Sequence, residues 1–183
     1  METKEMLIDD IMNGGVYAVS LVENPAIEDD FIYLSTEHLK LAITEQGMVY
    51  GMALIPDKKI PRRSASGETY EIYFTGETVR QAAHLFLTRH QNNNVTLGHE
   101  VETNGVSFVE SWVVVDEKLD KLAALGLNPV KGAWALGGYV KDESIREDIK
   151  AGRFKGFSIE GKFKNKESFE SKLNALLDKF DNK

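Results

Sequence analysis

The sequence has no cysteine among its 183 residues. Disulfide bridges, thiolate metal sites and cysteine nucleophiles are therefore excluded. The sequence also lacks a run of about 18 apolar residues, the length that a membrane-spanning helix needs, so we expect no membrane partner. Basic residues are fewer than acidic ones, with 22 Lys and Arg against 29 Asp and Glu, which gives a net charge of −7. This balance predicts no nucleic-acid partner, because such proteins present a basic face.

Motifs for metals and phosphates are missing as well. The four histidines include no HExxH motif and no pair at metal-ligand spacing, and His99-Glu100 alone is too little for zinc. Gly137-Gly138 lacks the residues that flank a phosphate-binding glycine loop. We therefore expect neither a metal nor an organic cofactor.

The chain has apolar patterns of both strands and helices. Strand patterns cover residues 16–22, 31–34, 39–44, 48–55, 70–74, 95–97, 106–115, 133–140 and 154–163, and helix patterns cover 75–90, 119–125, 142–151 and 168–180. Hairpins and short connections dominate the first half. This order predicts an α+β fold, with a curved, mainly antiparallel, barrel-like sheet surrounded by helices.

The length suits one domain with flanking segments. We expect a flexible N-terminal arm over residues 1–13 and the domain itself over residues 14–164. Residues 165–183 contain an amphipathic helix that we expect to pack on the domain, because its apolar residues form one stripe. A basic, polar loop is predicted over residues 56–67.

Ser158 lies in an unusual strand, Gly156-Phe157-Ser158-Ile159-Glu160-Gly161. Strands favour β-branched and aromatic residues, and glycine weakens them unless another group must approach the backbone closely. A hydroxyl among small residues is what a nucleophile needs if a substrate backbone is to reach it. The other interpretation is a tight strand that packs against a neighbour.

His99 differs from the other histidines because it follows Gly98 at the end of a strand pattern. Strand ends and the loops after them often carry catalytic bases. His38, His84 and His90 are interpreted as surface or boundary residues. His99 is therefore the candidate general base.

Glu110 is the candidate partner for that base. Side chains alternate faces along a strand, so Phe108, Glu110 and Trp112 are expected on one face. A carboxylate between two aromatics is costly unless it is paired, and an imidazole would make it the third element of a serine triad. Glu110 could instead face solvent or a basic side chain, and Glu160 and Asp116 are alternative third members.

Four segments together resemble a known family: residues 16–27 (VYAVSLVENPAI), 98–100 (GHE), 109–112 (VESW) and 155–161 (KGFSIEG). In this order the chain resembles the phage prohead (capsid-maturation) serine proteases, most closely their XkdF-like branch. Two further segments, 52–56 and 60–62, also look like the family. The resemblance spans about residues 14–164.

This resemblance implies a fold like that of the herpesvirus assemblin proteases. It implies a serine nucleophile and a histidine base, which match Ser158 and His99, and it implies no cofactor. Assemblins use a second histidine after the serine, and no histidine follows His99 here. The third member is then an acid. Glu110 is preferred, because a carboxylate between two aromatic residues needs a partner, and Glu160 and Asp116 are the alternatives.

The implied function is processing of the scaffold protein, the major capsid protein and the protease itself. The implied location is the host cytoplasm, inside the immature phage capsid. Self-cleavage is expected in the arm 1–13, the loop 56–67 or the charged C-terminus, and a homodimer through helices is compatible with the resemblance. The alternative is a catalytically inactive protease-fold protein that acts in capsid assembly.

Overall fold

The computed structural model describes residues 2–23, 41–44, 46–64, 66–167 and 171–173. The strands are β1 (Glu2–Leu7), β2 (Gly15–Val22), β3 (Ala42–Ile43), β4 (Met48–Leu54), β5 (Ile60–Arg63), β6 (Thr69–Phe74), β7 (Val95–Leu97), β8 (Val101–Thr103), β9 (Val106–Val113), β10 (Trp134–Val140), β11 (Gly156–Lys162) and β12 (Lys164–Asn165). The helices are α1 (Gly76–Thr88), α2 (Lys121–Ala124), α3 (Glu143–Lys150) and the 3₁₀ turn η2 (Gln91–Asn93).

The strands form three four-stranded sheets, in the orders β12-β1-β6-β5, β3-β4-β10-β9 and β11-β2-β7-β8. Only the pairs β1–β6 and β2–β7 are parallel among the described strands. The fold is therefore mixed α+β, built mostly of strands with few helices. Within the described residues the three sheets do not close into a barrel, so the barrel-like shape stays a prediction.

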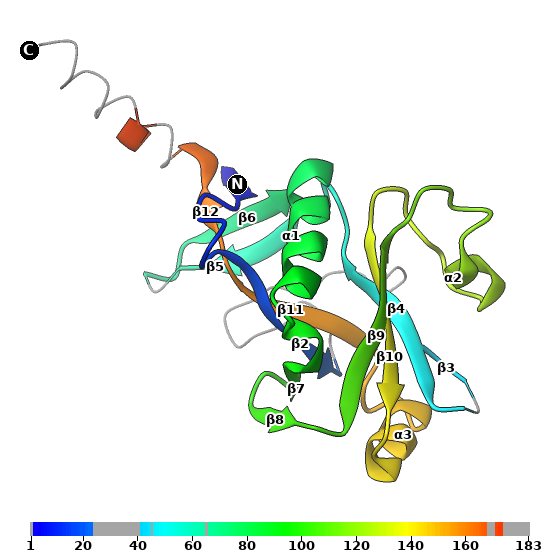
Figure 1. Cartoon of the computed structure of the whole chain (residues 1–183). Coiled ribbons are helices and arrows are strands. Elements are labelled where there is room, and N and C mark those ends of the chain that lie inside the picture. Colours follow the sequence, from blue (N-terminus) through cyan, green and yellow to red (C-terminus); the bar gives the residue numbers. More distant parts are fainter. Residues whose placement is uncertain (1, 24–40, 45, 65, 168–170, 174–183) are drawn as a thin grey trace, which may run out of the picture.

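Helix α1 joins the three sheets. It packs against β2, β6, β9 and β10, and Figure 1 shows it running through the middle of the molecule. Thr75 caps its first turn by accepting the Thr78 N–H. Val79, Ala82 and Phe86 recur on one helix face and are fully buried, as an amphipathic helix against a core requires.

A row of aromatic rings runs through the core from α1 to β11. The Phe86 ring centroid lies 5.2 Å from that of Trp134 and 6.1 Å from that of Phe108. Phe108 in turn lies 5.3 Å from Phe157, next to Ser158. All these pairs meet edge to face, the arrangement that aromatic quadrupoles favour. The strand that carries Ser158 is thereby anchored in the centre of the core.

The N-terminal segment differs from the predicted arm, because Glu2–Leu7 form strand β1 between β12 and β6. Its sequence is mostly polar and shows no apolar alternation, which is why it was missed. Backbone hydrogen bonds hold the strand, and polar side chains add to them: Thr3 donates to Glu71 at 3.1 Å and Lys166 to Glu5 at 3.0 Å. The predicted loop 56–67 likewise contains a strand, β5.

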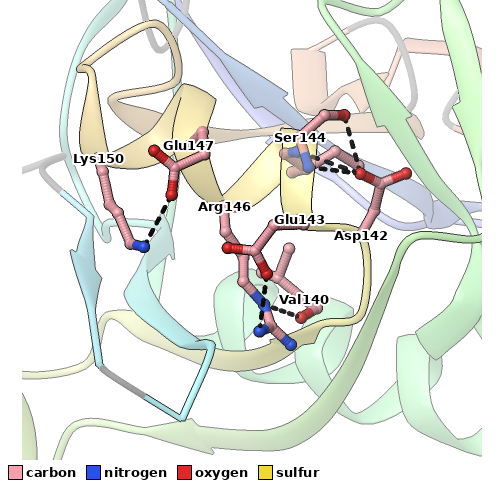
Figure 2. A network of polar contacts seen from close by, with 8 residues as sticks. Val140, Asp142, Glu143, Ser144, Arg146, Glu147 and Lys150 are labelled. Atoms are coloured by element: carbon pink, nitrogen blue, oxygen red, sulfur yellow. Dashed lines mark hydrogen bonds and ion pairs between the residues drawn. The ribbon is translucent and has the colours of Figure 1, made fainter.

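Helix α3 carries a network of charged side chains (Figure 2). Asp142 caps it by accepting the backbone N–H groups of Ser144 at 2.8 Å and Ile145 at 3.3 Å. Arg146 donates to the Val140 carbonyl at 2.7 Å and pairs with Glu143. These contacts hold the start of α3 against the end of β10.

Two predicted elements cannot be compared with the structure. The strand pattern at 31–34 lies outside the described residues, and of the helix pattern at 168–180 only residues 171–173 lie inside them. Within the described part of the chain, no helix is both long enough and apolar enough to cross a bilayer.

Candidate active site

Ser158 lies on β11, the edge strand of its sheet, beside β2 (Figure 1). The two strands are antiparallel, and Ser158 stands opposite Ser20. The Phe157 side chain is buried in the core, whereas Ser158 is half-buried. The alternation along β11 therefore holds the hydroxyl-bearing residue on the face away from the core.

His99 lies in the tight turn between β7 and β8. Gly98 and His99 both have positive φ, +60° and +62°, and the Glu100 N–H donates to the Leu97 carbonyl at 3.2 Å. Positive φ at both central residues is typical of type I′ turns, which favour Asn and Gly. A histidine in this conformation stores local strain, and such strain concentrates at functional sites.

Strand β2 brings the turn and β11 together. Ser20 pairs with Ser158 on one side and with Thr96 of β7 on the other. The fully buried Ser20 hydroxyl accepts the His99 backbone N–H at 2.9 Å. Ala18 and Ser20 are the small residues on this face of β2. Their size leaves room for an imidazole to reach across β2 from the turn to β11.

The His99 imidazole meets a carboxylate on β11. His99 Nδ1 lies 3.1 Å from Glu160 Oε1, and the two side chains are only 10% and 16% exposed. Thr96 Oγ1 donates to the same carboxylate oxygen. A carboxylate on Nδ1 fixes the tautomer and the ring orientation, and it makes Nε2 the nitrogen that exchanges a proton.

Glu160 is two residues from Ser158 on the same strand. Residues two apart share a face of a strand. Ser158 and Glu160 thus share one face of β11, and the His99 imidazole contacts Glu160 on that face. Such an arrangement can hold a histidine as a base and stabilise it when it becomes charged.

Glu110, the preferred third member, has other partners. Its carboxylate accepts the Tyr50 hydroxyl at 3.1 Å and pairs with Lys121. The β9–β10 register shifts between Phe108 and Glu110, so that Val109 is an extra, exposed residue. This β-bulge turns Phe108 into the main core and Glu110 to the other face. The predicted shared face of Phe108 and Glu110 is therefore wrong, because the alternation is interrupted.

The third acidic candidate, Asp116, is exposed and accepts the backbone N–H groups of Lys118 and Leu119. It starts a turn, as aspartates often do. Of the three predicted acids, Glu160 is the one whose carboxylate contacts His99 in the structure. His38 lies outside the described residues.

A small pocket opens beside Ser158. Its walls come from the end of β4, from β5 and from β11, and they are mostly apolar, with Leu54, Ile55 and Ile60 among them. Two basic residues, Lys58 and Arg62, also line it. The free volume is about 50 Å³, several times the roughly 10–15 Å³ that one water needs. The pocket can therefore hold a short side chain next to the serine.

Comparison with known proteins adds a family to this geometry. The family described as "Putative phage serine protease XkdF" matches residues 37–167, more than half of the chain. The chain belongs to this family. No curated protein and no solved structure matches.

Membership of the XkdF family makes the chain a serine protease of phage type in general terms. The matched range contains Ser158, His99 and Glu160. It begins after β2, so Ala18 and Ser20 lie outside it although they stand between the serine and the histidine. The resemblance drawn from the sequence is thus confirmed for the phage serine protease family.

Three residues of the site were not predicted. Ser20 left a signal, as the one serine in the apolar run of β2. Thr96 and Lys58 left none, because their roles depend on which strands become neighbours. A polar residue within an apolar strand is the pattern that could have identified Ser20.

Proposed function

We propose that the chain is an active prohead-maturation endopeptidase, with Ser158 as nucleophile, His99 as general base and Glu160 as the residue that orients the base. The observation that carries the proposal is the 3.1 Å contact between His99 Nδ1 and Glu160 on the strand of Ser158. Glu160 replaces Glu110 in this role because Glu110 binds Tyr50 and Lys121 instead.

The reaction is acyl transfer. Ser158 Oγ attacks the scissile carbonyl carbon while its proton passes to His99 Nε2, and negative charge develops on the carbonyl oxygen. The C–N bond then breaks, and the leaving amine takes the proton from His99. Water attacks the acyl-enzyme in the same way and regenerates Ser158. Glu160 stabilises the imidazolium in both halves without taking its proton.

The proposed substrates are the scaffold protein, the major capsid protein and the protease itself, inside the immature capsid in the host cytoplasm. The family membership supports this setting, since it names a phage serine protease. An assemblin-like architecture and a homodimer belong to the same proposal.

The test of the chemistry uses a fluorophosphonate, which forms a covalent bond with an activated serine. We expect intact-mass analysis to show one adduct, mapped by peptide sequencing to Ser158, and no adduct on Ser158→Ala. His99→Asn should also abolish labelling while folding normally, because asparagine tolerates positive φ. His90→Asn is the matched control, since His90 also has positive φ but is exposed. Labelling that persists in both Ser158→Ala and His99→Asn contradicts the proposal.

The test of the biological role co-expresses the chain with its capsid and scaffold proteins. We expect shortened capsid and scaffold chains with the wild type and full-length chains with Ser158→Ala. If particles assemble equally well with both forms and no processing occurs in either, the chain is the catalytically inactive assembly protein. Self-cleavage fragments should be absent from Ser158→Ala alone.

A further inference from the structure

Lys58 is the least expected side chain beside the candidate nucleophile. It follows β4 in the chain, and it is one of two basic residues, with Arg62, that line the pocket beside Ser158. The Nζ atom is fully buried, and no hydrogen-bond partner for it exists among the described residues. Burial lowers the pKa of the Lys58 amino group below its usual value.

An ammonium group in this position is costly by itself. The pocket walls are mostly apolar, and a buried charge without a partner destabilises a protein. Nearby Lys59 shows the ordinary arrangement, because it is exposed and pairs with Glu71 at 3.4 Å. The amino group of Lys58 thus lacks a partner that a ligand can supply.

We propose that Lys58 binds an acidic substrate side chain, so that the protease cleaves after glutamate or aspartate. The pocket adjoins the nucleophile, where the side chain that precedes the scissile bond must lie. Its volume of about 50 Å³ suits a short side chain and not a large aromatic one. The inference rests on the proposed function, because it needs Ser158 as the nucleophile.

The chemistry of the pocket favours a carboxylate over other groups. The carboxylate supplies the acceptor that Nζ lacks and favours the charged form of Lys58 against the effect of burial. The apolar walls contact the methylene part of the substrate side chain. A neutral amide of the same shape gains less, because it can accept a hydrogen bond from the ammonium group but carries no opposite charge to attract it.

The other role open to a buried lysine is that of general base for Ser158. The structure favours substrate binding, because His99 already meets Glu160 in the arrangement of a base and its orienting acid. The two roles differ in one measurement. Loss of a base abolishes labelling of the serine by fluorophosphonate, whereas loss of a specificity residue leaves labelling intact.

The experiment incubates the full chain with a proteome-derived peptide mixture and sequences the new termini by mass spectrometry. We expect wild type to cleave after Glu and Asp, and about 10- to 100-fold less efficiently after Gln and Asn, the range that a charged hydrogen bond gives. Lys58→Met should lose this preference and keep fluorophosphonate labelling of Ser158. Lys59→Met, which removes the same charge from the neighbouring residue, should keep the preference.

The reverse substitution gives a sharper outcome. Lys58→Glu should remove the preference for Glu and Asp, since it places a negative charge in the pocket beside Arg62 and specificity follows the charge of the pocket. Cleavage by wild type without enrichment of acidic residues overturns the inference and leaves the proposed function standing. Lys58→Met that folds but is no longer labelled makes Lys58 a base and also overturns it. Absence of both labelling and cleavage in wild type overturns the proposed function itself.

Discussion

Helix α3 and the His99 site are built from the same kinds of contact, yet they depend on the sequence in opposite ways. On α3, Glu147 pairs with Lys150 three residues later, and both side chains are more than half exposed. At the site, His99 and Glu160 are 61 residues apart and nearly buried. Exposed local pairs contribute little to stability. A nearly buried pair between distant strands, such as His99 and Glu160, forms only when the whole chain is folded, and it determines which reactions the site can support.

The largest difference is expected for the carboxylate at His99. Glu160→Gln keeps the shape of the side chain but removes the charge that orients and stabilises the imidazole. We expect kcat for a cleaved peptide to fall by about 10³- to 10⁴-fold, as for the orienting acid of other serine triads. The measurement is steady-state kinetics on one peptide substrate.

Glu110→Gln is the matched control, since Glu110 was the acid preferred from the sequence. Its kcat should stay within about threefold of wild type, because Glu110 contacts Tyr50 and Lys121 and not His99. If Glu110→Gln loses activity and Glu160→Gln retains it, the assignment made from the structure is wrong.

The second effect concerns the hydrogen bond under the turn. Ser20→Ala removes the acceptor of the His99 N–H in a fully buried place. An unsatisfied buried donor costs about 1–3 kcal/mol, and we expect the free energy of unfolding in urea to fall by that amount. Ser64→Ala removes a similar acceptor at an exposed turn and should change it by less than about 0.5 kcal/mol. Equal losses in the two variants would contradict the importance of burial here.

A smaller effect is expected at the cap of α3, and it depends on pH. Hydrogen bonds from Ser144 and from backbone N–H groups lower the pKa of Asp142 below 3.8. The carboxylate therefore stabilises the fold above that ordinary value, and the contribution is lost as pH falls through the lowered pKa. Asp142→Ala should lower Tm by roughly 2–4 °C at pH 7, with unchanged kcat. The difference in Tm between wild type and Asp142→Ala should shrink in acid. A difference that grows in acid would show that the ionised Asp142 carboxylate does not stabilise the fold.

The smallest effect is expected for the exposed pair on α3. Glu147→Gln should change Tm by less than about 1 °C, because salt and water screen such pairs. Lys150→Met and the double variant complete a cycle in which the coupling between the two residues is close to zero. A measurable coupling free energy between Glu147 and Lys150 would contradict the expectation that exposed pairs contribute little to stability.

The sequence predicted the parts of the fold that rest on local patterns. Most strands and helices were located, including helices α1 and α3, because each has its own periodicity or capping residue. Strand β1 was missed because its partners, not its side chains, make it a strand. The bulge at Val109 was missed because one extra residue leaves no mark in the sequence and reverses every expected face beyond it.

The candidate site divides in the same way. Ser158 and His99 were chosen from glycine neighbours and strand ends, and their roles stay predictions. The family resemblance was confirmed in its general form. The acid that contacts His99 was not the one preferred from the sequence, since Glu110 and Glu160 differ only in which strand lies next to His99. Strand order is a property of the folded chain, so the contact between His99 and Glu160 had to come from the structure.

The short hairpin that carries His99 has a consequence for how the protease can be silenced. Strand β8 is a three-residue edge strand that is largely exposed, whereas β11 is tied to the aromatic row of the core. Segments with few buried contacts open independently of global unfolding. Amide hydrogen exchange should therefore be fast in β8 (Val101–Thr103) and slow at Phe157 and Ser158. The proposed base can then detach while the proposed nucleophile stays in place, which would give a folded protease an inactive state that needs no cleavage to reach.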